Sequence, residues 1–103
     1  MTMKRYDKLV RDKIPWIIEE AGKKCRYRTC DGEEFHSYLF NKLVEEVEEF
    51  IAGPCPAELA DIYEVLEAIS AELKLSSASA DQIAKRVTKG AFEDKIILEW
   101  VQE

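Results

Sequence analysis

The sequence has little of several residue types on which common kinds of site depend. Its 103 residues include one histidine and three cysteines, and no two of the cysteines have CxxC spacing. Zinc centres and disulfide frameworks need more of these ligands, so we expect reduced cysteines and a cytoplasmic setting. No apolar run approaches the ~20 residues of a membrane-spanning helix, so we expect no membrane partner.

The charge balance is acidic, with 21 Asp and Glu against 15 Lys and Arg and a net charge of −6 at pH 7. An acidic chain does not favour a nucleic-acid polymer as partner; cations, or anions bridged by cations, suit it better. The hydrophobic share of 47% is too high for disorder. The length fits one domain, so we expect residues 1–103 to form a single helical domain.

Apolar periodicity predicts a mostly α fold built on two long helices. The first begins at Asp31 or Gly32 and the second covers about residues 56–74. Between them lies Gly53-Pro54-Cys55-Pro56, in which the glycine favours the end of the first helix and proline favours the first turn of the second. So short a connection predicts an antiparallel hairpin. The two apolar stripes would face each other, with Phe35, Leu39, Leu43, Val47, Phe50 and Ile51 on one and Leu59, Ile62, Tyr63, Val65, Leu66, Ile69 and Leu73 on the other.

Shorter elements complete the expected fold. Pro15 opens a helix over residues 16–21, and Ser79 caps another over residues 80–89 that Gly90 ends. Residues 24–30 (KCRYRTC) are rich in types that favour a strand. The tail over residues 95–101 (KIILEWV) is ambiguous between helix and strand, and we favour a strand. Paired with residues 24–30, it would form a small two-stranded β element.

Two pairs of acidic residues are the strongest candidates for chemistry. Glu46 and Glu49 in the first long helix, and Glu58 and Asp61 in the second, are each spaced i, i+3, which puts both carboxylates of a pair on one face. All four are turned towards the apolar stripes, and the pairs stand at matching distances from Gly53 on the two arms of the hairpin. We therefore expect four carboxylates to converge at a partly apolar seam.

Such a cluster is costly when it is unpaired. A buried ionised carboxylate carries a desolvation penalty of several kcal/mol, and neighbouring like charges add to it. Protonation relieves this cost, and so does a hard divalent cation, which prefers oxygen ligands. We expect Mg²⁺, with Mn²⁺ as a substitute, because a carboxylate-held Mg²⁺ is a common means of hydrolysing phosphoanhydrides. The simpler alternative is a solvated acidic face, and this is our interpretation of Glu45, Glu48, Glu64 and Glu67.

Basic residues at the two ends of the chain are candidates for binding phosphate. Lys8, Arg11 and Lys13 lie near the N-terminus, and Lys89 follows Lys85 and Arg86 near the end of the last predicted helix. An acidic protein needs local positive charge to hold phosphate groups. The alternatives are that these are ordinary surface charges or that Arg11 pairs with a nearby acid.

These motifs resemble those of a known family. The pattern EExxE at Glu45, Glu46 and Glu49, followed by ExxD at Glu58 and Asp61, resembles the all-α nucleoside triphosphate pyrophosphohydrolases. That group includes MazG, the helical dUTP and dCTP pyrophosphatases and phosphoribosyl-ATP pyrophosphohydrolase. KLVRDKIP, ELADIYEVLEAI and KGAFEDKIIL are similar to a small MazG-like, phosphoribosyl-ATP-pyrophosphohydrolase-like subfamily, and the matches extend over nearly the whole chain.

The resemblance implies Mg²⁺-dependent cleavage between the α and β phosphates of a nucleoside triphosphate, including removal of non-standard nucleotides. It implies Glu46, Glu49, Glu58 and Asp61 as metal ligands, with Glu45, Glu46 and Glu49 in catalysis and Glu45 orienting water. It also implies a homodimer or homotetramer. Two alternatives stay open at this point. One is a non-catalytic helical interaction module whose acidic seam pairs with Lys or Arg, and the other is the phosphoribosyl-ATP pyrophosphohydrolase reaction.

Overall fold

A computed structural model describes residues 2–102, and this range contains four helices and no strand. They are α1 (Ile14–Glu20), α2 (Gly32–Ala52), α3 (Pro56–Glu72) and α4 (Ala78–Lys89). The expectation of a helical fold is confirmed. None of these helices combines the length and the apolar character needed to cross a bilayer.

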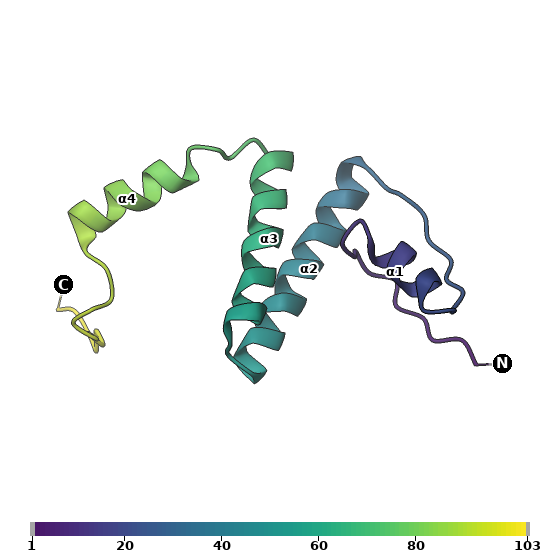
Figure 1. Ribbon diagram of the computed structural model, residues 1–103. Helices are drawn as coiled ribbons and strands as arrows, with labels where there is room; N and C mark the ends of the chain where they lie inside the picture. The colour runs from purple at the N-terminus through teal and green to yellow at the C-terminus, as the bar shows by residue number, and fades with distance from the viewer. Residues whose placement is uncertain (1, 103) are drawn as a thin grey trace.

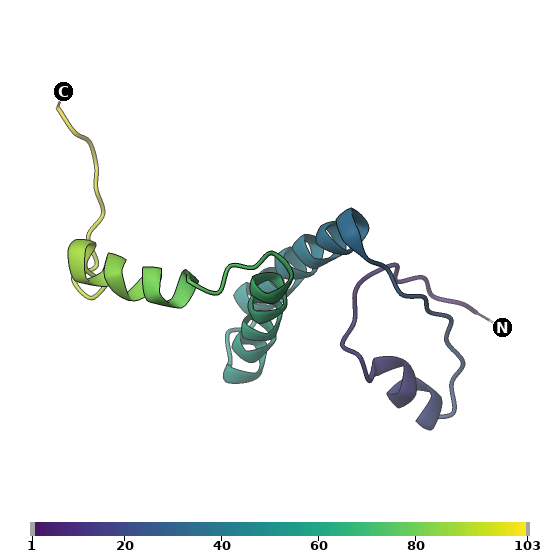
Figure 2. The ribbon, with the colours of Figure 1, turned by 90° about the horizontal axis from the view of Figure 1, so that it is seen from above.

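The centre of the molecule is the antiparallel pair α2 and α3, which lie side by side in both ribbon views (Figures 1 and 2). Its buried apolar core consists of Leu39 from α2 and of Val65 and Ile69 from α3. These belong to the stripes expected from the sequence. Around them pack five half-buried residues: Leu9, Phe35, Leu43, Ala68 and Leu73.

Local signals explain where the long helices end. Gly53 is the C-cap of α2, and Pro56 occupies the first turn of α3, as expected. The third helix ends at Glu72 rather than Lys74, because Lys74 takes a left-handed backbone with φ of 57° that no helix continues through. Gly90, with φ of 84°, ends α4 as expected.

The short helices differ slightly from the expected bounds. The first covers Ile14–Glu20, beginning before Pro15 rather than at Trp16. The last begins at Ala78, two residues ahead of the expected start, and Ser79 lies inside its first turn instead of capping it. Serine is tolerated within a first turn as well as at the cap, so its position fixes the start only approximately.

The prediction of a small two-stranded β element is wrong, because residues 2–102 contain no strand. Residues 24–30 and 95–101 do not form strands, and they lie at opposite ends of the molecule in Figure 1. The first follows α1 beside the start of α2, whereas the second follows α4 on the far side of α3. A strand needs a neighbouring backbone to satisfy its hydrogen bonds, and neither segment has the other within reach.

The chain is extended. Its principal extents are 62 × 30 × 26 Å, and its radius of gyration is 18.6 Å, against about 13 Å for a compact chain of this length. The cause is visible in Figures 1 and 2, where α4 and residues 91–102 reach away from the hairpin. We call α4 together with residues 91–102 the arm.

Candidate functional site

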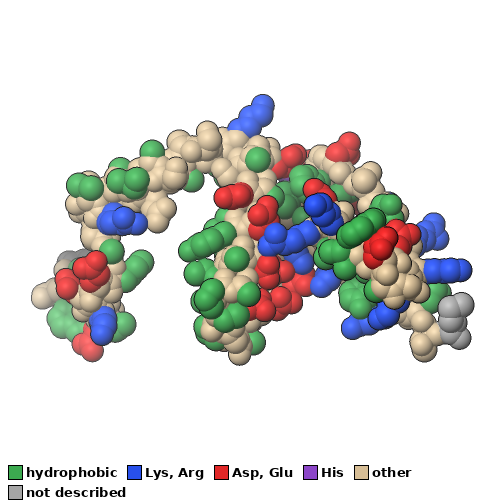
Figure 3. All heavy atoms as spheres, in the orientation of Figure 1, with side chains coloured by type: hydrophobic (Ala, Val, Ile, Leu, Met, Phe, Trp, Pro, Cys, Tyr) green, Lys and Arg blue, Asp and Glu red, His purple; other side chains and the backbone are tan. Residues whose placement is uncertain are grey.

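One side of the hairpin gathers acidic side chains from both long helices. We call Glu45, Glu46 and Glu49 of α2 and Glu58 and Asp61 of α3 the acidic cluster. Figure 3 shows acidic side chains along the side of α3 that faces the N-terminal part of the chain, with basic side chains next to them. The spacing within each helix and the antiparallel turn bring the two groups to the same height, as the sequence predicts.

Three of these residues could share one ion. Glu46, Glu58 and Asp61 each offer a carboxylate oxygen, and the three oxygens lie within 4.8 Å of one another. Glu46 is buried and the other two are half-buried. The structure therefore brings together three of the four expected metal ligands, whereas Glu49 is exposed beside them.

Two oxygens in this group are buried without a partner. Glu46 is only 5% exposed, and its Oε2 has no hydrogen-bond donor. The same holds for Oε2 of Glu58. An unsatisfied buried carboxylate oxygen costs free energy that a donor or a cation would recover. The donor set of three converging carboxylates, two of them with free oxygens, fits a hard divalent cation.

Lysines partly neutralise the α2 side of the cluster. The ammonium of Lys8 lies 2.6 Å from Oε1 of Glu45. Lys42 lies 3.5 Å from Oε2 of Glu45 and 3.1 Å from Oε1 of Glu46. Lys42 was not among the residues expected in the site, although its i, i+4 spacing to Glu46 is a signal that could have identified it.

Arginine neutralises the α3 side. Arg11 donates from Nη2 to Oδ1 of Asp61 at 2.8 Å, and its Nη1 lies 3.9 Å from Glu64. Of the two interpretations of Arg11 made from the sequence, phosphate binding or an ion pair with a nearby acid, the structure shows the ion pair. The N-terminal segment is held in this position by two further contacts. The Tyr38 hydroxyl donates to Asp7 at 2.7 Å, and Leu9 packs against the core.

The cluster is still negative after these pairings. Its five carboxylates face three cations, Lys8, Lys42 and Arg11, which leaves a formal charge of −2. The pKa of Glu49 reflects this excess. It is raised first by the charge of Glu46, then by burial, and then by the charges of Glu45 and Glu58. One divalent cation would balance the remaining charge.

The pKa of Glu45 moves in the opposite direction. Partial burial acts to raise it, but the hydrogen bond from Lys8 and the charges of Lys42 and Lys8 outweigh burial and lower it. The pKa of Lys8 is raised, chiefly by the same hydrogen bond. Glu45 is therefore held as a carboxylate, and the expectation that it is only part of a solvated face gives way to a lysine-paired position.

The remaining expected phosphate-binding residues lie apart from the cluster. Lys13 is the N-cap of α1 and is exposed. Lys89 is in the last turn of α4, on the arm, which lies on the other side of α3 from α2 in Figure 1. Within one chain, therefore, Lys8 and Arg11 contact the cluster, whereas Lys89 does not approach it.

Two hollows on the surface lie away from the acidic cluster. One, of about 450 Å³, is formed by the end of α4 and the loop after it, including Arg86 and Phe92. The other, of about 400 Å³, lies where α3 meets the start of α4, including Tyr63 and Leu66. Neither hollow contains a residue of the acidic cluster.

Comparisons with known proteins add no relative. A scan against protein-family models finds no match, and searches of curated proteins and of solved structures find none either. The family resemblance noted from the motifs stays a prediction.

Proposed function

We propose that the acidic cluster binds a divalent cation, Mg²⁺ by preference and Mn²⁺ as a substitute, and that the protein is a nucleoside triphosphate pyrophosphohydrolase. The observation that carries the proposal is the pair of buried oxygens without partners, on Glu46 and Glu58, within 4.8 Å of an oxygen of Asp61. Mg²⁺ in phosphate-processing sites is bound by carboxylate oxygens, and three carboxylates converge in this cluster.

Glu46, Glu58 and Asp61 would hold the ion, with Glu49 next to them as a fourth ligand. When bound, Mg²⁺ offsets phosphate charge and activates water as a nucleophile. The reaction adds one water across the α–β phosphoanhydride bond, and the products are a nucleoside monophosphate and pyrophosphate. Non-standard nucleotides are included among the proposed substrates.

The chain's own residues supply orientation and positive charge. Glu45, kept ionised by Lys8 and Lys42, is a hydrogen-bond acceptor suited to orienting the attacking water. Lys8 and Arg11 already lie against the cluster, where their charges can pair with phosphate oxygens. The proposed phosphate-binding set also includes Lys13 and Lys89, which do not contact the cluster within one chain.

The test is pyrophosphate release from a broad panel of nucleoside triphosphates with Mg²⁺ or Mn²⁺. Asp61→Asn and Glu49→Gln are expected to lose more than about a hundredfold in activity, because each removes a ligand charge. Glu48→Gln makes the same change in charge at an exposed position of α2 and should keep wild-type activity. Absence of release from every nucleotide, or activity that survives both ligand variants, would refute the proposal.

A second candidate is a non-catalytic interaction module. The observation that favours it is the set of ion pairs from Lys8, Lys42 and Arg11 to the cluster, which resembles a salt-bridged acidic seam. Such a module would not bind Mg²⁺ specifically. The residual charge of −2 and the two partnerless oxygens favour the enzyme.

Within the enzyme proposal, the phosphoribosyl-ATP pyrophosphohydrolase reaction is the main alternative. It breaks the same type of bond, so the carboxylate geometry serves both substrates equally. Including phosphoribosyl-ATP in the panel separates them. Preference for a simple nucleoside triphosphate over phosphoribosyl-ATP is the expected result.

A further inference from the structure

Lys42 is the least exposed of the three cations that contact the acidic cluster. Its side chain is 15% exposed, compared with 38% for Lys8 and 52% for Arg11. Its ammonium lies 3.1 Å from Oε1 of Glu46 and 3.5 Å from Oε2 of Glu45, because residues three and four positions further along a helix lie on the same face. Lys42 is therefore held in place, since leaving these partners would leave a largely buried ammonium unpaired.

The two oxygens of Glu46 consequently have different surroundings. Oε1 is held by Lys42, whereas Oε2 is buried and has no hydrogen-bond partner. A cation that took both oxygens would have to displace Lys42 or lie very close to its positive charge. Such repulsion is only weakly screened at a site that is shielded from water. Glu46 is thus limited to offering one oxygen to an ion.

Asp61 is restricted in a similar way. Arg11 donates to its Oδ1 at 2.8 Å, so this oxygen already has a charged partner. Two of the three carboxylates that could share an ion therefore have one oxygen bound by a cation of the same chain. These pairings limit the number of oxygens that the cluster can give, in addition to lowering its negative charge.

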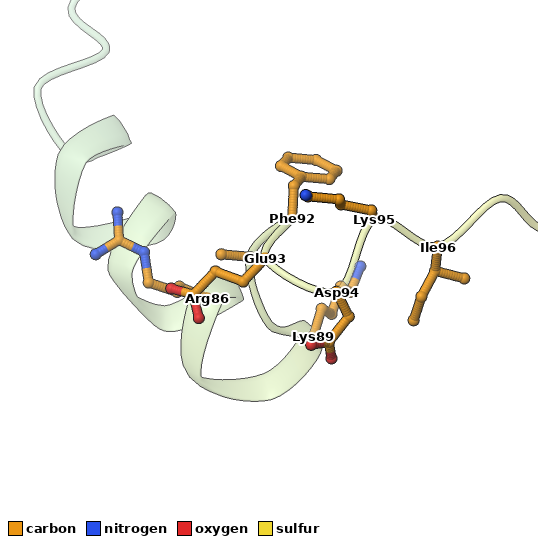
Figure 4. A pocket seen from close by; sticks show the side chains of 8 residues that line it. Arg86, Lys89, Phe92, Glu93, Asp94, Lys95 and Ile96 are labelled. Atoms are coloured by element: carbon orange, nitrogen blue, oxygen red, sulfur yellow. The ribbon is translucent and has the colours of Figure 1, made fainter.

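Acidic side chains at the end of the arm are arranged differently. At the hollow after α4, Glu93 and Asp94 are exposed and project from the loop in different directions (Figure 4). Within residues 2–102, neither belongs to a group of carboxylates that meet at one point. Converging carboxylates held by a lysine of low exposure occur in the hairpin and not at this loop.

Mg²⁺ and Ca²⁺ differ in how they use carboxylates. Mg²⁺ requires a near-octahedral arrangement of ligands at about 2.0–2.1 Å and usually keeps several waters. Ca²⁺ takes about six to eight oxygens at about 2.3–2.6 Å and often binds both oxygens of one carboxylate. Ligands that can give only one oxygen each therefore disfavour Ca²⁺ more than Mg²⁺.

We propose that Lys42 is a positioning residue that sets the metal selectivity of the acidic cluster, favouring Mg²⁺ over Ca²⁺ by keeping one oxygen of Glu46 occupied. The inference rests on the proposed binding of a divalent cation and goes beyond it, because net charge does not distinguish two ions of equal charge. Removing any lysine from the cluster makes it more negative and strengthens its attraction for both ions. The ratio of the two dissociation constants therefore separates the positioning role of Lys42 from the effect of its charge.

Calorimetric titrations with Mg²⁺ and with Ca²⁺ measure this ratio. The wild-type protein should bind Mg²⁺ at least about tenfold more tightly than Ca²⁺. Lys42→Met keeps the aliphatic part of the side chain and loses the ammonium, and it should reduce this preference at least about tenfold, because Glu46 can then offer both oxygens. Lys42→Arg retains the charge and a donor to Glu46 and should keep the wild-type preference.

Lys8→Met is the matched control, because it removes the same charge from the same cluster. Lys8 lies against Glu45, whereas Lys42 holds Glu46, so both ions should bind Lys8→Met more tightly and their ratio should stay at the wild-type value. An unchanged ratio in Lys42→Met, or an equal loss of preference in Lys8→Met, would overturn the proposal.

The wild-type protein alone also tests the proposal, without a variant that has to fold. Binding of Ca²⁺ as tight as that of Mg²⁺ would overturn the role of Lys42 and leave the proposed metal site standing. Absence of a saturable heat with either ion would refute the metal site itself, and the role of Lys42 with it.

Discussion

At the scale of single residues, the site is defined by carboxylates that differ in their partners. Glu45 has two lysines, Glu46 has one and a free buried oxygen, and Glu58 has a free buried oxygen. The i, i+3 spacing of the acids was enough to predict their convergence. Their pairing with Lys8 and Arg11 was not, because these contacts join residues 37 and 50 positions apart and no periodicity connects such positions.

The lowered pKa of Glu45 gives a prediction at this scale. Its ordinary value is 4.5, so the Lys8–Glu45 pair stabilises the folded state above that pH and loses this contribution as pH falls through the lower folded pKa. In Lys8→Met the pKa of Glu45 should rise, because partial burial then acts with less opposition. Carbon-detected NMR titration of the glutamate carboxyls measures this shift. Lys4→Met, which removes an exposed lysine outside these ion pairs, is the control, and an unchanged Glu45 pKa in Lys8→Met would contradict the assignment.

At the scale of secondary-structure elements, the hairpin follows directly from its sequence. The Gly53–Pro56 turn and two facing apolar stripes were sufficient to predict α2, α3 and their antiparallel packing. The β element could not be predicted correctly, because strand-favouring composition says nothing about whether a partner backbone lies within hydrogen-bonding distance. Likewise, periodicity located the apolar stripe of α2 without showing that Ile51 would be exposed and Leu39 buried.

The small core makes the hairpin sensitive to loss of one side chain. Leu39 is the most deeply buried of the described residues, at 2% exposure, and it forms the buried core cluster together with Val65 and Ile69 of α3. Leu39→Ala should reduce the free energy of unfolding by about 3 kcal/mol, through lost burial and the cavity that remains. Urea denaturation followed by circular dichroism measures this change. Ser37→Ala, at an exposed position of α2, should change it by less than about 0.5 kcal/mol, and equal effects of the two substitutions would argue against this core.

At the scale of the whole molecule, the two sides of the hairpin carry different kinds of side chain. One side brings together the N-terminal segment, α2 and α3 around five carboxylates and three cations. The other side and the arm carry exposed apolar side chains, among them Val44, Val87 and Phe92. The i, i+3 spacing of the acids and the short turn between the two helices predicted that carboxylates would converge on the first side, and Glu46, Glu58 and Asp61 do so. The extent of uncovered surface became apparent only from the three-dimensional arrangement, since it depends on where α4 points after residue 77.

The central claim is that the acidic cluster holds a divalent cation, and calorimetric titration with Mg²⁺ tests it most directly. The wild-type protein should give a saturable heat of binding. Glu58→Gln should lose it, because one of the two partnerless oxygens then carries no charge. Glu67→Gln, which makes the same change at an exposed position of α3, should bind like the wild type. No saturable heat in the wild type, or equal binding by all three proteins, would contradict the account.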